Sequence, residues 1–91
     1  MTATSQSTSE RRQGIMRELK REINRHITGN ATLWIDIDNT VHVRIDDKFF
    51  TTEIEIDQTT VQQHNASPYL LTPYVLAKYE IQLLKKFIKS E

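Results

Sequence analysis

The chain has 91 residues, of which 37% are hydrophobic and 26% charged, a composition typical of one small globular domain. Its formal net charge is zero, so overall electrostatics favour neither nucleic acid nor an anionic membrane. The sequence contains no cysteine, which excludes disulfides, thiolate metal ligands and catalysis by a thiol. We find no apolar run of the roughly 18 residues that span a membrane and no secretory signal, and therefore expect a cytoplasmic protein.

The charge is unevenly distributed along the chain. Residues 1–30 carry a net charge of +3, residues 31–57 a net charge of −5 and residues 58–91 a net charge of +2. The folded domain is therefore expected to present an acidic surface from its central segment and basic surfaces from its two ends.

The first predicted element is a helix over residues 8–28, preceded by a flexible polar tail over residues 1–7. Ser7 and Glu10 have the spacing of a capping box, and Gly29 is a candidate C-cap because glycine tolerates a left-handed turn. Apolar residues recur on one side of this helix, a stripe wide enough to cover one face of a sheet: Ile15, Met16, Leu19, Ile23 and Ile27.

The central segment alternates apolar and polar residues almost without a break, which predicts strands over residues 32–38, 41–46 and 49–57. Side chains on a strand point alternately to opposite faces, so the meander has one apolar and one polar face. Pairing Leu33 with Ile45, and Ile45 with Phe50, brings apolar residues together across both hairpins. In this register Ile37 lies on the apolar face, opposite Val41.

The same register predicts the neighbours on the polar face of the sheet. Trp34 is expected opposite Arg44, and His42 between Asp36 and Glu53. An exposed tryptophan beside an arginine is typical of an interface. The alternative is that residues 58–71 fold over Trp34 and bury it.

Residues 58–71 show no clear pattern beyond some local structure, and a second long helix is expected over residues 73–90. Thr72 and Pro73 suit a cap followed by a first-turn proline. The apolar arc of this helix covers nearly half its circumference, more than one sheet requires, so the helix must also meet the first helix or another subunit. Of monomer and homodimer, the homodimer is the expected state. The predicted fold class is α+β, order α-β-β-β-α, with two helices packed on one face of a three-stranded antiparallel meander.

Two patterns bear on chemistry. The segment from Trp34 to Thr40 contains D-x-D-x-T at Asp36 and Asp38, which resembles the nucleophile motif of haloacid-dehalogenase-type phosphotransferases; the resemblance implies a nucleophile at Asp36 and an acid/base at Asp38. The chain is too short for the rest of that fold. His42 with Asp36 and Glu53 has the residue types of a divalent metal site, whereas ordinary cross-strand charge pairing accounts for the same residues. We therefore predict no enzyme, cofactor or metal.

The order of elements resembles the double-stranded-RNA-binding domain in topology alone, because the basic start of the last helix is missing here. We predict a non-enzymatic protein-binding module, an accessory factor or inhibitor of the kind that phages and mobile elements encode. Its partner is expected to be another protein, one with a basic surface or a second copy of the chain. The predicted binding residues are Trp34, Asp36, His42, Arg44, Phe49, Glu53 and Glu55. The alternative is a nucleic-acid binder that uses cations of the first helix: Arg11, Arg12, Arg17, Lys20 and Arg21.

Overall fold

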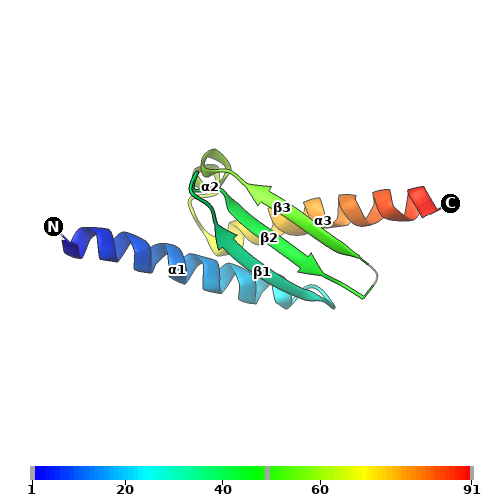
Figure 1. Ribbon diagram of the computed structural model, residues 1–91, viewed down its shortest axis with the longest axis horizontal. Helices are drawn as coiled ribbons and strands as arrows, with labels where there is room; N and C mark the ends of the chain where they lie inside the picture. Colours follow the sequence, from blue (N-terminus) through cyan, green and yellow to red (C-terminus); the bar gives the residue numbers. More distant parts are fainter. Residues whose placement is uncertain (1, 49, 91) are drawn as a thin grey trace.

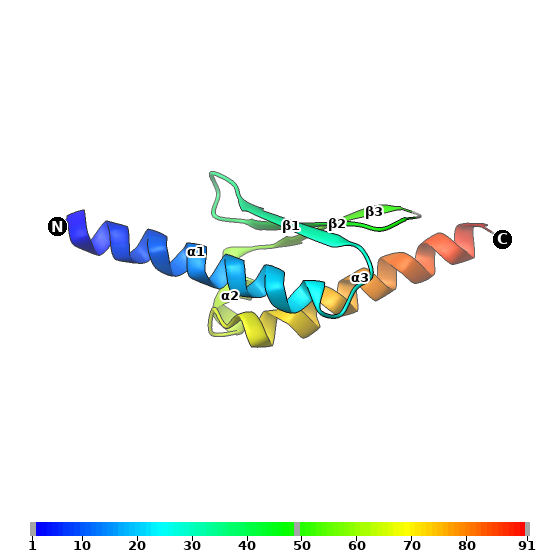
Figure 2. The ribbon, with the colours of Figure 1, turned by 90° about the horizontal axis from the view of Figure 1, so that it is seen from below.

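The computed structural model describes residues 2–48 and 50–90 and shows a three-stranded antiparallel sheet with helices on one face (Figure 1). The strands follow the order β1-β2-β3, so each hairpin joins neighbours. Figure 2 shows the sheet as one layer and helices α1 and α3 as a second layer on one side of it. The predicted fold class is therefore confirmed, with one additional short helix, α2. The elements are α1 (Thr2–Asn24), β1 (Asn30–Ile35), β2 (Val41–Asp46), β3 (Thr51–Ile56), α2 (Gln58–Gln63) and α3 (Pro68–Ser90).

The first helix begins and ends earlier than predicted. Residues 2–7, which the prediction placed in a tail before the helix, belong to α1, so Ser7 lies within the helix rather than at its start. Extending a helix that has already formed costs far less than starting one. At the other end, Asn24 stops the helix, since its Oδ1 accepts a hydrogen bond from the backbone N–H of Ala31 (2.9 Å).

Gly29 is not the predicted C-cap of α1, and its backbone is not in the left-handed region. A Cβ atom at this position would overlap the backbone oxygen of Asp46. Gly29 is therefore required by the close approach of two backbones, where the chain enters β1 beside the end of β2.

The pairing register differs by two residues from the prediction in both hairpins. Leu33 lies opposite Val43, and Val43 lies opposite Ile54. A shift of two keeps every strand residue on its predicted face, which is why the apolar face is still correct. The strand bounds change accordingly, and only β2, over residues 41–46, matches its prediction.

The register of the first hairpin is shifted because its loop has five residues, 36–40, and Asp36 organises this loop. The backbone N–H of Asp36 donates to the Thr40 carbonyl (3.1 Å), and the Asp36 carbonyl accepts from the Asn39 N–H (3.0 Å). Asn39 adopts a left-handed conformation (φ 63°), which asparagine tolerates. Ile37 therefore lies in the loop with an exposed fraction of 98% rather than on the apolar face.

The segment over residues 58–71, expected to be irregular, forms α2 and the first turn of α3. Asp57 caps α2 by accepting a hydrogen bond from Thr60 N–H (2.8 Å). Helix α3 starts at Pro68, so the predicted cap at Thr72 is wrong, and Pro73 lies inside the helix. Pro68 has the fixed φ suited to a first helical position, and the Thr72 hydroxyl donates to the Pro68 carbonyl (2.7 Å).

The hydrophobic core lies between the sheet and the two long helices. Its fully buried large side chains come from α1, β2, β3 and α3, and are Leu19, Ile23, Val43, Ile45, Ile56, Leu71 and Val75. Figures 1 and 2 show that α1 and α3 run in the same direction but are staggered, so the start of α1 and the end of α3 extend beyond opposite ends of the sheet. The protruding part of α3 has no sheet above it.

Candidate functional site

The second face of the sheet is not covered by any helix of the described chain (Figure 2). The register places its side chains in three cross-strand rows. We call this surface the open sheet face, and its nine residues are Asn30, Thr32, Trp34, His42, Arg44, Asp46, Thr51, Glu53 and Glu55.

Trp34 is the largest side chain of the open sheet face and has an exposed fraction of 38%. Its neighbour across the strands is His42, not the predicted Arg44. The two rings stack almost in parallel, with centroids 5.2 Å apart and an interplanar angle of 5°. The alternative in which residues 58–71 bury Trp34 is wrong, because α2 and the start of α3 lie on the other side of the sheet. Trp34 is thus both exposed and held in one orientation.

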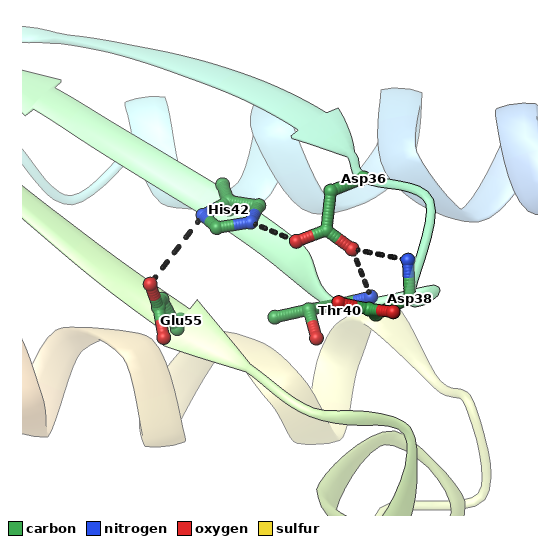
Figure 3. Close-up of polar contacts among 5 residues, drawn as sticks. All are labelled: Asp36, Asp38, Thr40, His42 and Glu55. Atoms are coloured by element: carbon green, nitrogen blue, oxygen red, sulfur yellow. Dashed lines mark hydrogen bonds and ion pairs between the residues drawn. The ribbon is translucent and has the colours of Figure 1, made fainter.

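Asp36 connects this stack to the loop over residues 36–40 (Figure 3). One of its oxygens accepts hydrogen bonds from the backbone N–H groups of Asp38 (2.8 Å) and Thr40 (3.1 Å). The other lies 2.7 Å from His42 Nε2. The hydrogen bond with His42 and that with the Thr40 N–H lower the pKa of Asp36. The ionised carboxylate can only accept, so His42 donates from Nε2, and Asp36 fixes the orientation of its ring.

The second carboxylate near His42 is Glu55, not the predicted Glu53. His42 Nδ1 lies 3.9 Å from Glu55 Oε1, whereas Glu53 is paired across the strands with Arg44. The error follows directly from the two-residue shift in register. Within residues 2–48 and 50–90, no group of three or more histidine and acidic side chains could hold a metal ion. The Asp36–His42 pair is therefore best described as a positioning contact for Trp34.

Arg44 occupies the central row of the open sheet face, between Thr32 and Glu53. Its Nε lies 3.3 Å from Asp46 Oδ1, in an ion pair exposed to solvent. Asp46 and Glu53 thus flank the one arginine of this face, and Glu55 lies in the next row opposite His42. The face has an acidic character, as expected from the charge of residues 31–57. The predicted binding residue Phe49 lies outside the described residues.

Two exposed apolar features lie outside the open sheet face. Ile37, expected in the core, protrudes from the Asp36 loop at the Trp34 end of the sheet. On the C-terminal half of α3, four large apolar side chains are at least half exposed, and these are Ile81, Leu84, Phe87 and Ile88. The wide apolar arc of the last helix was the sequence signal for the exposed side chains on α3. No sequence signal indicated that Ile37 is exposed, because the alternation of apolar and polar residues continues through it.

The cations of the nucleic-acid alternative lie on α1 and are exposed. Arg11 and Arg12 line a small cleft of about 200 Å³ at the end of the sheet, and Arg12 Nη1 donates to Asn39 Oδ1 (3.0 Å). Lys20 and Arg21 lie further along the helix. None of these residues belongs to the open sheet face, but Arg12 and Arg17 line a hollow together with Asp36, so the two predicted sets meet at the loop over residues 36–40.

Comparisons with known proteins add no identification. No protein-family model matches the chain, and neither curated proteins nor solved structures include a significant match. In the described part of the chain, none of the helices has the length and apolar character needed to cross a membrane.

Proposed function

We propose that this protein is a non-enzymatic protein-binding module and that the open sheet face is its binding surface. The observation that carries the proposal is the exposed Trp34 ring, stacked on His42 and fixed through Asp36. Tryptophan is among the residues that contribute most at interfaces. A ring already held in place loses little conformational entropy on binding, so more of its burial energy contributes to affinity.

The charges around Trp34 indicate the chemistry of the partner. This face carries three carboxylates and one arginine: Asp46 and Glu53 flank Arg44, and Glu55 lies opposite His42. A protein with a basic surface complements them, and complementary charges raise both association rate and specificity. The same charges disfavour phosphate, and thus nucleic acid, on this face. An accessory factor or inhibitor that binds a basic protein fits this surface.

The double variant Trp34→Ala, Arg44→Ala tests the proposal. Both side chains are exposed enough for the variant to keep its fold and its circular dichroism spectrum. Immobilised wild-type and variant proteins are exposed to the same cell extract, and retained proteins are compared by quantitative mass spectrometry. We expect the variant to lose proteins that the wild type retains. Equal retention by the two would contradict the assignment.

The matched control is Lys20→Ala, Arg21→Ala, which removes two exposed side chains from α1 instead. It is expected to retain the same proteins as the wild type. Loss of ligands in this control alone, together with a steep decrease of binding with salt, would instead favour the nucleic-acid alternative on α1.

A further inference from the structure

Helix α3 carries a second apolar stripe on a different side from its buried one. The core side consists of Leu71, Val75 and Tyr79. The second stripe, which we call the outer stripe, consists of Leu70, Tyr74, Ala77, Ile81, Leu84 and Ile88. Its spacing alternates between four and three residues from end to end, which is the heptad repeat of a coiled coil.

The outer stripe is open to solvent over most of its length. The exposed fractions are 49% for Leu70, 51% for Ile81, 61% for Leu84 and 70% for Ile88. Tyr74 is the half-buried residue of the stripe: it packs against the core cluster, makes an edge contact with His64 and lies under Lys78. From Leu70 to Ile88 the stripe extends about 27 Å at 1.5 Å per residue. An apolar surface of this length and regularity is typical of a helix that pairs with another helix.

We propose that the outer stripe binds the same stripe of a second copy of this chain, in a parallel two-stranded coiled coil. In heptad terms, Ile81 and Ile88 occupy a positions and Leu84 occupies a d position. Isoleucine at a with leucine at d is the combination that favours two parallel strands over higher oligomers.

The flanking charges select the parallel orientation. Glu80 occupies a g position and Lys85 the following e position. In a parallel pair these two positions face each other across the helices, so Glu80 of each copy meets Lys85 of the other. An antiparallel pair instead brings e positions together and sets Lys78 against Lys85, a like-charge contact. A heterologous helical partner carries no such requirement for matching charges.

The proposed dimer leaves Trp34 and its edge of the open sheet face free. Apart from Tyr74, the stripe residues are not part of the core, which lies between α3 and the inner face of the sheet (Figure 2). Ile81 shares a hollow with Glu53 and Glu55 at the β3 edge, whereas Trp34 lies on β1, at the opposite edge of the sheet. Self-association through α3 is thus independent of the proposed binding of a partner at Trp34.

The test is sedimentation equilibrium of the full chain over a range of concentrations, with four proteins compared. The wild type is expected to form a dimer. Leu84→Glu places a charge in the seam of each helix and is expected to weaken dimerisation at least about 100-fold. Gln82→Glu, a change at an exposed position of α3 outside the stripe, is the matched control and is expected to dimerise like the wild type. All variants are first checked by circular dichroism for an unchanged fold.

The fourth protein, Lys85→Glu, reads the orientation of the helices. In a parallel pair, the substituted side chain of each copy faces Glu80 of the other, so two repulsive contacts replace two attractive ones. Dimerisation is then expected to weaken roughly tenfold. An antiparallel pair would gain the attraction between Lys78 and the new glutamate, and a stronger dimer would overturn the parallel arrangement. A wild-type monomer at all concentrations, or a dimer insensitive to Leu84→Glu, would overturn the proposal itself.

Discussion

The Asp36 side chain makes three polar contacts that organise the connection between β1 and β2. It ends β1, closes the loop that follows and orients His42 beneath Trp34. Asp38, two residues further along the chain, contributes only its backbone N–H to this arrangement. The D-x-D-x-T segment is thus explained by turn chemistry, in which an aspartate side chain replaces missing ladder hydrogen bonds.

The lowered pKa of Asp36 predicts a pH dependence of stability. A carboxyl group whose pKa is lower in the folded state stabilises the fold above its unfolded pKa of about 3.9, and this contribution disappears as the pH falls through the folded pKa. Asp36→Asn keeps an oxygen for the backbone N–H groups but has no proton to gain. We therefore expect the decrease in melting temperature between pH 6 and pH 3 to be smaller in Asp36→Asn than in the wild type.

Thermal unfolding followed by circular dichroism at several pH values measures this difference. Asp38→Asn is the control in the same loop and is expected to retain the full wild-type decrease, because the Asp38 carboxylate takes no part in the hydrogen bonds to His42 and Thr40. If Asp36→Asn and the wild type lose equal stability on acidification, Asp36 is not the group that links the loop to pH.

At the scale of elements, sequence patterns predicted which residues share a face but not how far each element extends. Because side chains alternate between the two faces, Val43 and Ile54 stay in the core when the strand pairing shifts by an even number of residues. The predicted faces of the sheet are therefore correct. The register itself depends on loop length, and the loop over residues 36–40 is longer than apolar pairing of Ile37 with Val41 requires. This loop is stabilised by hydrogen bonds of the Asp36 side chain. Such bonds leave no periodic pattern in the sequence, so the pattern of apolar residues could not predict them.

The candidate site shows the same division. Trp34, His42 and Arg44 were correctly assigned to one face of the sheet, because the alternation of side chains along each strand is enough to decide this. The predicted cross-strand neighbours were displaced by two residues, so Glu53 was expected opposite His42, where the structure has Glu55. The outer stripe of α3 was visible only as an excess of apolar residues, since its separation from the buried stripe requires knowing which side meets the sheet.

The two glycines of the chain predict opposite effects of the same substitution. In Gly29→Ala the new methyl group meets the backbone of Asp46, and one of the two segments must move. We expect a loss of about 1–3 kcal/mol in the free energy of unfolding. Gly14→Ala adds a methyl group in open space inside α1 and is expected to add about 0.5–1 kcal/mol.

Urea unfolding at a fixed protein concentration provides both values from one series of measurements. Both substitutions add the same methyl group, so a difference between their free energies of unfolding reports the surroundings of the two positions. A stabilising Gly29→Ala would show that the junction between α1 and β1 is not as close to β2 as the structure has it.

Taken together, the sheet and α3 present two surfaces with different chemistry. The open sheet face is acidic and polar around one fixed tryptophan, and the outer stripe is apolar with a heptad spacing. Pairing through the stripe would present two open sheet faces in one particle. Two linked binding faces raise the apparent affinity for a partner with repeated sites without any new contact.

Hydroxyl-radical footprinting of the concentrated wild-type protein, compared with a dilute sample, tests this division of surfaces most directly. We expect Leu84 and Ile88 to become protected from oxidation as the protein concentration rises, while Trp34 stays as reactive as in the dilute protein. Protection of Trp34 with continued oxidation of Leu84 and Ile88 would contradict this expectation, and would show that the open sheet face is where two copies of the chain meet.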